Sequence, residues 1–170
     1  MQKTNKKIHI IGIAGAGASA LAIMLKDLGH QVSGSDEGFY EPTVSLLKKH
    51  DIKILSPYKK DNIPDDVDLI IVGKHAKLNS EENKEVALAL KQKDKVKSFP
   101  EILGGITKDR DNIVVAGSYG KSTCSALMAL CLVEGGIPAG YFFGAIPVGF
   151  DDNAHIGTAK EFVLEGDEYP

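Results

Sequence analysis

Apolar runs of strand length alternate along the chain with longer segments in which apolar residues recur at helical spacing. Short apolar runs bounded by glycine or polar residues predict strands that are buried on both faces of a sheet. Such strands are predicted at 7–13, 31–36, 67–73 and 96–99. Helices are predicted at 18–28, 42–50, 80–94 and 100–106. This alternation predicts an α/β fold, in which helices cover both faces of a parallel sheet.

The alternation pauses in the polar segment 107–112 and then starts again. Beyond it the pattern predicts strands at 113–117, 139–144 and 161–168, a helix at 121–134 and a polar loop at 151–160. We therefore place a domain boundary near residue 109, which gives the domains 1–108 and 109–170. Because three strands rarely complete a doubly wound sheet, we expect the second domain to continue in a longer protein.

The composition is that of an ordinary globular protein, with 43% hydrophobic and 25% charged residues in a chain of 170. A net charge of −3 argues against a general binder of nucleic acid or membrane surfaces. No apolar run reaches transmembrane length and no secretory signal is recognisable, so we expect a cytoplasmic protein. Cys124 and Cys131 share one face of a predicted helix, too far apart for a disulfide, and are predicted to be reduced core residues.

The first glycine-rich turn, GIAGAGASA, joins a predicted strand to a predicted helix. Its spacing, Gly15-x-Gly17-x-x-Ala20 with Gly12 before it, is typical of the diphosphate-binding turn of a Rossmann-like domain. Glycine lets backbone amides at a helix N-terminus approach a diphosphate, and Asp36 ends the next strand, where an acid can bind a ribose hydroxyl. The alternative is that the glycines only let the helix pack closely on the strand. The pattern indicates a diphosphate on a ribose without specifying the nucleotide.

The second glycine-rich turn, GSYGKST, also joins a strand to a helix, and it resembles a shortened phosphate-binding P-loop. In such a loop Lys121 would neutralise the β- and γ-phosphates, and the Ser122 hydroxyl would meet Mg²⁺. The final strand carries Glu165 at its end, with Asp167 and Glu168 close by, and this supplies the acid that a P-loop ATPase requires. An ordinary strand-to-helix turn is the alternative. The pattern predicts the start of an α/β ATPase domain.

Four segments together make the chain similar to the Mur ligases, ATP-dependent amide ligases of bacterial peptidoglycan synthesis: IHIIGIAGAGASALA, GHQVSGSD, GSYGKST and EFVLEGDEY. The short ATPase loop of that family, G-[TS]-x-G-K-[ST]-[TS], accounts for the missing first glycine. The resemblance implies a Rossmann-like domain over 1–108 that holds a UDP-muramoyl substrate, followed by the N-terminal part of an ATP-binding domain over 109–170.

The resemblance also implies roles for individual residues. Lys121 is expected to act in catalysis, by neutralising the β- and γ-phosphates of ATP during transfer. Ser122 and Glu165 are expected to hold Mg²⁺. The UDP-sugar is expected at Gly12, Gly15, Gly17 and Asp36. ATP is expected at Gly117, Ser118, Tyr119, Gly120, Lys121, Ser122 and Thr123.

Within the family, the segments GFYEP and DEY favour the branch that joins UDP-N-acetylmuramate to the tripeptide L-alanyl-γ-D-glutamyl-meso-diaminopimelate in peptidoglycan recycling. The alternative branch adds L-alanine to the same acceptor in peptidoglycan biosynthesis. Two other classes stay open: a non-enzymatic dinucleotide-binding module that uses only the first turn, and a small kinase that uses only the second. The presence of both turns in this order argues against each of these two classes.

Overall fold

The computed structural model describes residues 5–73 and 80–166. The chain divides into two compact units, Met1–Leu103 and Gly104–Pro170. The division falls inside helix α4 (Phe99–Thr107), whereas the boundary expected near residue 109 lies just beyond this helix. Among the described residues, none of the helices combines the length and apolar character needed to cross a membrane.

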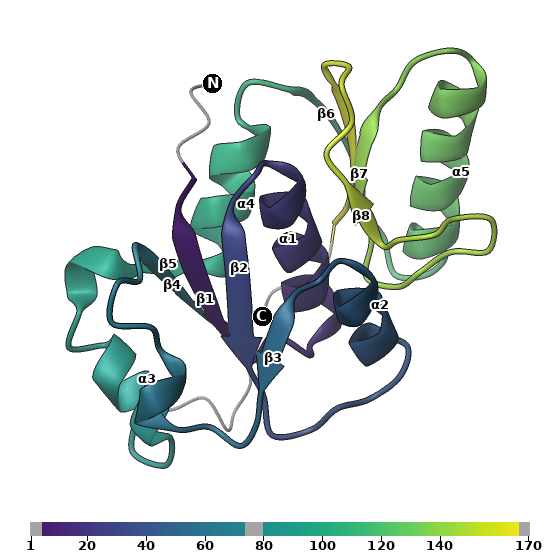
Figure 1. Cartoon of the computed structure of the whole chain (residues 1–170). Coiled ribbons are helices and arrows are strands. Elements are labelled where there is room, and N and C mark those ends of the chain that lie inside the picture. The colour runs from purple at the N-terminus through teal and green to yellow at the C-terminus, as the bar shows by residue number, and fades with distance from the viewer. Residues whose placement is uncertain (1–4, 74–79, 167–170) are drawn as a thin grey trace. The chain divides into compact units, whose positions relative to one another are not determined.

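The first unit is built on a five-stranded parallel sheet with the strand order β3-β2-β1-β4-β5, as Figure 1 shows. Its strands are β1 (Lys7–Ile11), β2 (Gln31–Ser35), β3 (Lys53–Leu55), β4 (Leu69–Val72) and β5 (Val96–Ser98). Its other helices are α1 (Ala16–Asp27), α2 (Thr43–Lys49) and α3 (Lys84–Ala89), with the 3₁₀ turns η1 (Lys60–Asn62) and η3 (Lys93–Lys95). This sheet confirms the predicted Rossmann-like α/β fold.

The strand order reverses at β1, and this reversal places helices on both faces of the sheet. The chain moves outward from β1 to β3 through α1 and α2, then returns to β4 and moves the other way through α3. Because such crossovers are right-handed, α3 lies on the opposite face from α1 and α2. On the α3 face, a buried core forms from Ile11, Ile63, Val67, Ile70, Val86 and Ala89. In folds of this kind, ligands bind at the carboxyl ends of the strands near the reversal.

Two features of the first unit differ from the sequence prediction. Strand β3 was not expected, because three residues are too few to show a clear period. The helix expected over 80–94 is limited to α3, Lys84–Ala89. It begins there because the side chain of Asn83 accepts hydrogen bonds from the backbone amides of Glu85 and Val86, at 2.9 and 3.2 Å, and so caps the helix.

The second unit contains a four-stranded sheet with the order β6-β9-β7-β8. Its elements are β6 (Asp111–Val115), α5 (Lys121–Glu134), β7 (Gly140–Phe142), β8 (Ala154–His155) and β9 (Glu161–Glu165). Strands β6, β9 and β7 are parallel, whereas β8 pairs antiparallel with β7. Strand β8 lies inside the segment 151–160, which was expected to be a polar loop. Helix α5 packs on this sheet through a core cluster of Ala126, Ala129, Phe143 and Val163.

Helix α5 also corrects the expectation for the two cysteines. Both Cys124 and Cys131 are exposed, not buried in a core. The helix turns its small residues towards the sheet, and its buried positions are Ser125, Ala126 and Ala129. Its outer face remains apolar and exposed at Leu127, Met128, Leu130 and Val133.

Candidate functional site

The first glycine-rich turn lies at the carboxyl end of β1 and is held by the end of β2. Gly12 has a φ of 85°, in the left-handed region that glycine adopts without strain. The backbone amides of Gly12 and Ile13 both donate to the carbonyl oxygen of Ser35, at 2.8 and 3.1 Å. Gly15 is the N-cap residue of α1, and no side-chain hydrogen bond caps the helix there. The turn therefore presents the amide end of a helix dipole without a competing side chain.

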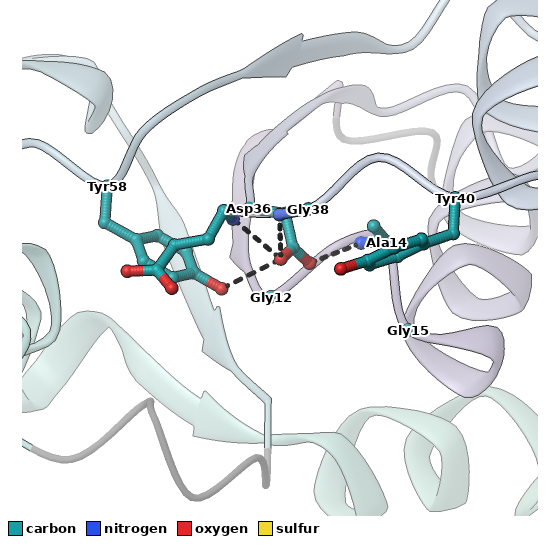
Figure 2. A pocket seen from close by; sticks show the side chains of 8 residues that line it. Gly12, Ala14, Gly15, Asp36, Gly38, Tyr40 and Tyr58 are labelled. Atoms are coloured by element: carbon teal, nitrogen blue, oxygen red, sulfur yellow. Dashed lines mark hydrogen bonds between the residues drawn. The ribbon is translucent and has the colours of Figure 1, made fainter.

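A pocket of about 570 Å³ opens beside this turn. Figure 2 shows Asp36 between Tyr58 on one side and Tyr40 on the other. The lining residues are Gly12, Ala14, Gly15, Asp36, Glu37, Gly38, Tyr40 and Tyr58. Three of the four residues predicted to hold a UDP-sugar thus lie in one pocket. The fourth, Gly17, lies in the first turn of α1 and does not line the pocket.

The carboxylate of Asp36 connects the end of β2 to the glycine-rich turn. Its Oδ2 accepts the backbone amide of Ala14 at 2.9 Å. Its Oδ1 accepts the amides of Glu37 at 2.8 Å and Gly38 at 3.4 Å, and the Tyr58 hydroxyl at 3.2 Å. A carboxylate oxygen has two lone pairs, so Oδ1 is fully engaged while Oδ2 can accept one further donor from a ligand.

Two tyrosines form opposite walls of the pocket, and the sequence analysis assigned neither to the site, although Tyr40 lies in the segment GFYEP. Burial, followed by the charge of Asp36 and the hydrogen bond to it, raises the pKa of Tyr58 well above its ordinary range, so Tyr58 stays a neutral donor to Asp36. Tyr40 is 74% exposed, and a Cβ at position 38 would clash with its ring. Gly38 therefore allows the Tyr40 ring to lie against the backbone at the pocket rim.

The second glycine-rich turn joins β6 to α5. Gly117 and Gly120 have φ values of 147° and 74°, which favour glycine at both positions. Helix α5 begins at Lys121, and the ammonium of Lys121 donates to the carbonyl oxygen of Gly117 at 2.9 Å. The side chain of Lys121 therefore folds back over the glycine-rich turn at the N-terminus of α5, a helix of 14 residues. Ser118, Tyr119 and Thr123, the other predicted loop residues, are exposed, and Tyr119 is 98% exposed.

The two residues predicted to hold a metal ion are in direct contact. The Ser122 hydroxyl donates to Oε1 of Glu165 at 2.5 Å, and the backbone amide of Gly144 donates to Oε2 at 2.7 Å. The contact arises because β9 pairs with β6 in a register that places Glu165 opposite Val115, just before the turn. Within the described ranges, no group of three or more His, Cys, Asp or Glu side chains could hold a metal ion. Asp167 and Glu168 lie outside those ranges.

Fold and sites together define an α/β protein in which each unit carries a glycine-rich turn between a parallel strand and a helix. The family model described as "Mur ligase family, catalytic domain" matches residues 7–111. The chain belongs to the Mur ligase family.

Relatives from two branches of this family resemble the chain. It is 34% identical over 164 residues to the UDP-N-acetylmuramate–L-alanyl-gamma-D-glutamyl-meso-2,6-diaminoheptandioate ligase of Escherichia coli (strain K12), covering 96% of this chain and 35% of the relative. It is 37% identical over 167 residues to the UDP-N-acetylmuramate–L-alanine ligase of Streptococcus pyogenes serotype M49 (strain NZ131), covering 97% and 35%. The crystal structure of a murein peptide ligase from Psychrobacter arcticus 273-4 matches with a TM-score of 0.88 and 29% identity, covering 96% and 38%. The chain spans about a third of the length of the curated relatives it matches.

Proposed function

We propose that this chain provides the UDP-sugar site and the ATP site of a ligase. The ligase joins UDP-N-acetylmuramate to the tripeptide L-alanyl-γ-D-glutamyl-meso-diaminopimelate in peptidoglycan recycling, through an acyl phosphate. The observation that carries the proposal is the occurrence of two glycine-rich turns in one family member. One turn borders the Asp36 pocket, and the other adjoins the Ser122–Glu165 pair.

The UDP-sugar is assigned to the pocket of the first unit. Its diphosphate would lie at the amide end of α1, beside Gly12 and Gly15, because no side chain caps the helix there. A ribose hydroxyl would donate to the remaining lone pair of Asp36 Oδ2. Gly17 would contribute through the first turn of α1 and not through the pocket wall.

ATP is assigned to the second turn, with its phosphates surrounded by the backbone amides of residues 117–122. Lys121 would leave the Gly117 carbonyl and neutralise charge on the β- and γ-phosphates. Ser122 and Glu165 would hold Mg²⁺, and they fit that ion because a hydroxyl and a carboxylate oxygen, both hard ligands, already lie in contact. The ion would supply charge neutralisation at the phosphates.

The reaction that these sites serve has two displacements. A muramoyl carboxylate oxygen attacks the γ-phosphorus of ATP, the bond to the β,γ-bridging oxygen breaks, and ADP leaves. The amine nitrogen then attacks the acyl carbonyl, inorganic phosphate leaves, and the nitrogen loses a proton. Such phosphoryl transfer depends mainly on positioning and charge neutralisation, which Lys121 and the loop amides would provide.

Calorimetric titration of the chain with UDP-N-acetylmuramate, with NAD⁺ titrated in parallel, tests the first site. We expect binding of the UDP-sugar, no response to NAD⁺, and loss of binding in Asp36→Ala. Binding of NAD⁺ alone would overturn the ligase proposal in favour of a dinucleotide-binding module. The expected cytoplasmic location stays a prediction.

The second candidate function is addition of L-alanine to the same acceptor, and the relative from Streptococcus pyogenes favours it. The tripeptide is preferred because of the names of four similar proteins. The relatives from Escherichia coli and Haemophilus influenzae and the solved structure from Neisseria meningitides are named as ligases of UDP-N-acetylmuramate with this tripeptide. The solved structure from Psychrobacter arcticus is named as a murein peptide ligase. Release of ADP by the ligase that carries this sequence, with the tripeptide and L-alanine supplied separately, decides between the two donors. Turnover with L-alanine alone would select the second candidate.

A further inference from the structure

A fully buried carboxylate lies between helix α3 and the sheet of the first unit, outside the pocket. Glu85 of α3 is 0% exposed, as is His9 of β1, which it contacts. Oε1 of Glu85 accepts the hydroxyl of Ser35 at 2.5 Å and lies 2.9 Å from Nε2 of His9. Oε2 accepts the backbone amide of Lys59 and the side-chain amide of Asn62, both at 2.9 Å. One side chain thus joins β1, β2, α3 and the β3–β4 connection.

Glu85 is charged at neutral pH although it is buried. Burial alone would raise the pKa of this carboxyl, but the hydrogen bonds from His9, Ser35, Asn62 and Lys59 outweigh that effect and lower it. Hydrogen bonds to an ionised acceptor are shorter and stronger than neutral ones, in keeping with the 2.5 Å contact to Ser35. Removal of the charge therefore weakens several contacts at once.

Two short routes lead from Glu85 to the pocket. In the first, Glu85 holds the Ser35 hydroxyl, and the carbonyl of the same Ser35 holds the amides of Gly12 and Ile13 in the glycine-rich turn. In the second, Glu85 holds the amide of Lys59, which follows Tyr58, and the Tyr58 hydroxyl holds Asp36. Both routes end at atoms that line the pocket or shape its turn.

We propose that Glu85 is a positioning residue for the nucleotide diphosphate pocket. It fixes the glycine-rich turn through Ser35, and it fixes Tyr58 and Asp36 through the Lys59–Asn62 segment. The inference rests on the proposed UDP-sugar site and adds a residue that does not itself line the pocket. It requires that ligand affinity falls when Glu85 loses its charge, even under conditions in which the protein is completely folded.

The variant Glu85→Gln removes the charge while keeping the shape of the side chain. Its amide oxygen can still accept from Lys59 and Asn62, and its NH₂ group can donate to His9 Nε2 in the tautomer protonated at Nδ1. This arrangement weakens the contact with Ser35, because the NH₂ group then occupies the position of Oε1, which accepts the Ser35 hydroxyl in the wild type. A second variant, Ser35→Ala, removes the first route alone and keeps the test open if Glu85→Gln does not fold.

Ser33→Ala is the matched control. Ser33 lies on β2 two residues before Ser35, and its hydroxyl lies 2.9 Å from Nδ1 of His9, on the opposite side of the imidazole from Glu85. Its removal takes one hydroxyl from the same polar network without touching either route to the pocket. The control therefore separates general loss of polar contacts from loss of positioning.

The experiment is calorimetric titration with UDP-N-acetylmuramate at a temperature far below the unfolding transition of each variant. We expect Kd to rise about fivefold to tenfold in Glu85→Gln and Ser35→Ala, as for loss of one ordinary hydrogen bond, and to stay near the wild-type value in Ser33→Ala. The amide resonances of Gly12 and Ile13 should shift in the first two variants only, a local change that general destabilisation does not produce.

Two results overturn the proposal for Glu85 while leaving the proposed function intact. In the first, wild-type protein binds UDP-N-acetylmuramate and Glu85→Gln keeps its Kd within about twofold of wild type, with Ser35→Ala read in its place if Glu85→Gln does not fold. In the second, Ser33→Ala weakens binding as much as Ser35→Ala does. Wild-type protein that binds no UDP-N-acetylmuramate overturns the proposed function, and this inference with it.

Discussion

At the scale of single residues, Asp36 has a structural task that a sequence fingerprint does not reveal. Its carboxylate accepts four donors from the protein, three of them backbone amides. A nucleotide would therefore find an acid that is already oriented, with Oδ1 engaged and Oδ2 partly available. The acid shapes the turn that is proposed to receive the diphosphate, in addition to any contact with the ribose.

Asp36→Asn tests both tasks. An asparagine places an NH₂ group either against the Ala14 amide or against the donors on Oδ1, so at least one donor loses its acceptor. We expect the free energy of unfolding to fall by about 1–3 kcal/mol and UDP-N-acetylmuramate binding to be lost. Urea denaturation and calorimetry measure the two effects. Glu37→Gln, in the same pocket, is the control and should keep wild-type stability, whereas a fully stable Asp36→Asn would contradict the structural task.

Lys121 offers a test confined to the second turn. Lys121→Met keeps the length of the side chain and removes the ammonium, so we expect MgATP affinity to fall roughly tenfold to a hundredfold, as for a lost charged hydrogen bond. Binding of UDP-N-acetylmuramate should not change. Lys48→Met, at an exposed position in the last turn of α2, is the matched control. Unchanged MgATP binding in Lys121→Met would contradict the proposed contact between Lys121 and the phosphates of ATP.

The charge of Glu85 makes the free energy of unfolding depend on pH. Its pKa is lowered in the folded protein relative to the ordinary value of 4.5, so its contribution to stability is complete above pH 4.5. The contribution is lost as the pH falls below 4.5 towards the folded-state value, because the unfolded chain then binds the proton more readily. In urea unfolding between pH 7 and pH 3, we expect a shallower acid loss of stability for Glu85→Gln than for wild type. Parallel curves for the two proteins would contradict this expectation.

At the scale of elements, the long apolar patterns were sufficient to predict β1, α1, β4, α5 and β9, because each combines a clear period with a glycine or polar boundary. The short elements could not be predicted in this way. Strand β8 has two residues inside a polar segment, and its position depends on pairing with β7, a contact between residues far apart in sequence. The helix predicted over 80–94 was too long at both ends. Asn83 caps α3, so the helix begins only at Lys84, and residues Lys93–Lys95 form the separate 3₁₀ turn η3.

Two glycines in different elements make a matched pair for stability. Gly34 lies in β2, where a Cβ would come within 2.5 Å of the Ile10 carbonyl oxygen, so Gly34→Ala must separate β1 from β2 beneath the glycine-rich turn. We expect a loss of about 1–3 kcal/mol in the free energy of unfolding. Gly104 lies exposed in α4 with open space around a Cβ, so Gly104→Ala should gain about 0.5–1 kcal/mol. Guanidinium denaturation compares the two, and a neutral Gly34→Ala would contradict the close strand contact.

At the scale of the whole molecule, the pocket of the first unit gathers residues from separate parts of the chain. The glycine-rich turn and Asp36 were predictable from their spacing, because the diphosphate fingerprint is local. Tyr58 and Glu85 were not, since their contacts with Asp36 and Ser35 depend on how the β3–β4 connection and α3 return to the sheet. Sequence spacing thus identified the turn, and only the fold identified the side chains that hold it.

The first unit contains all the described residues that line the pocket and the residues named above for the Glu85 network. A shortened chain of residues 1–108 keeps the five-stranded sheet and the whole of α4, whose last residue is Thr107. We expect it to unfold in one cooperative transition and to bind UDP-N-acetylmuramate with the Kd of the 170-residue chain, because the hydrogen bonds described above for Asp36 and for the glycine-rich turn all join residues of the first unit. Thermal melting and calorimetry test both points. A melt without a transition would show that the first unit depends on the second for folding, and a cooperative melt with much weaker binding would show that the second unit contributes to the ligand site.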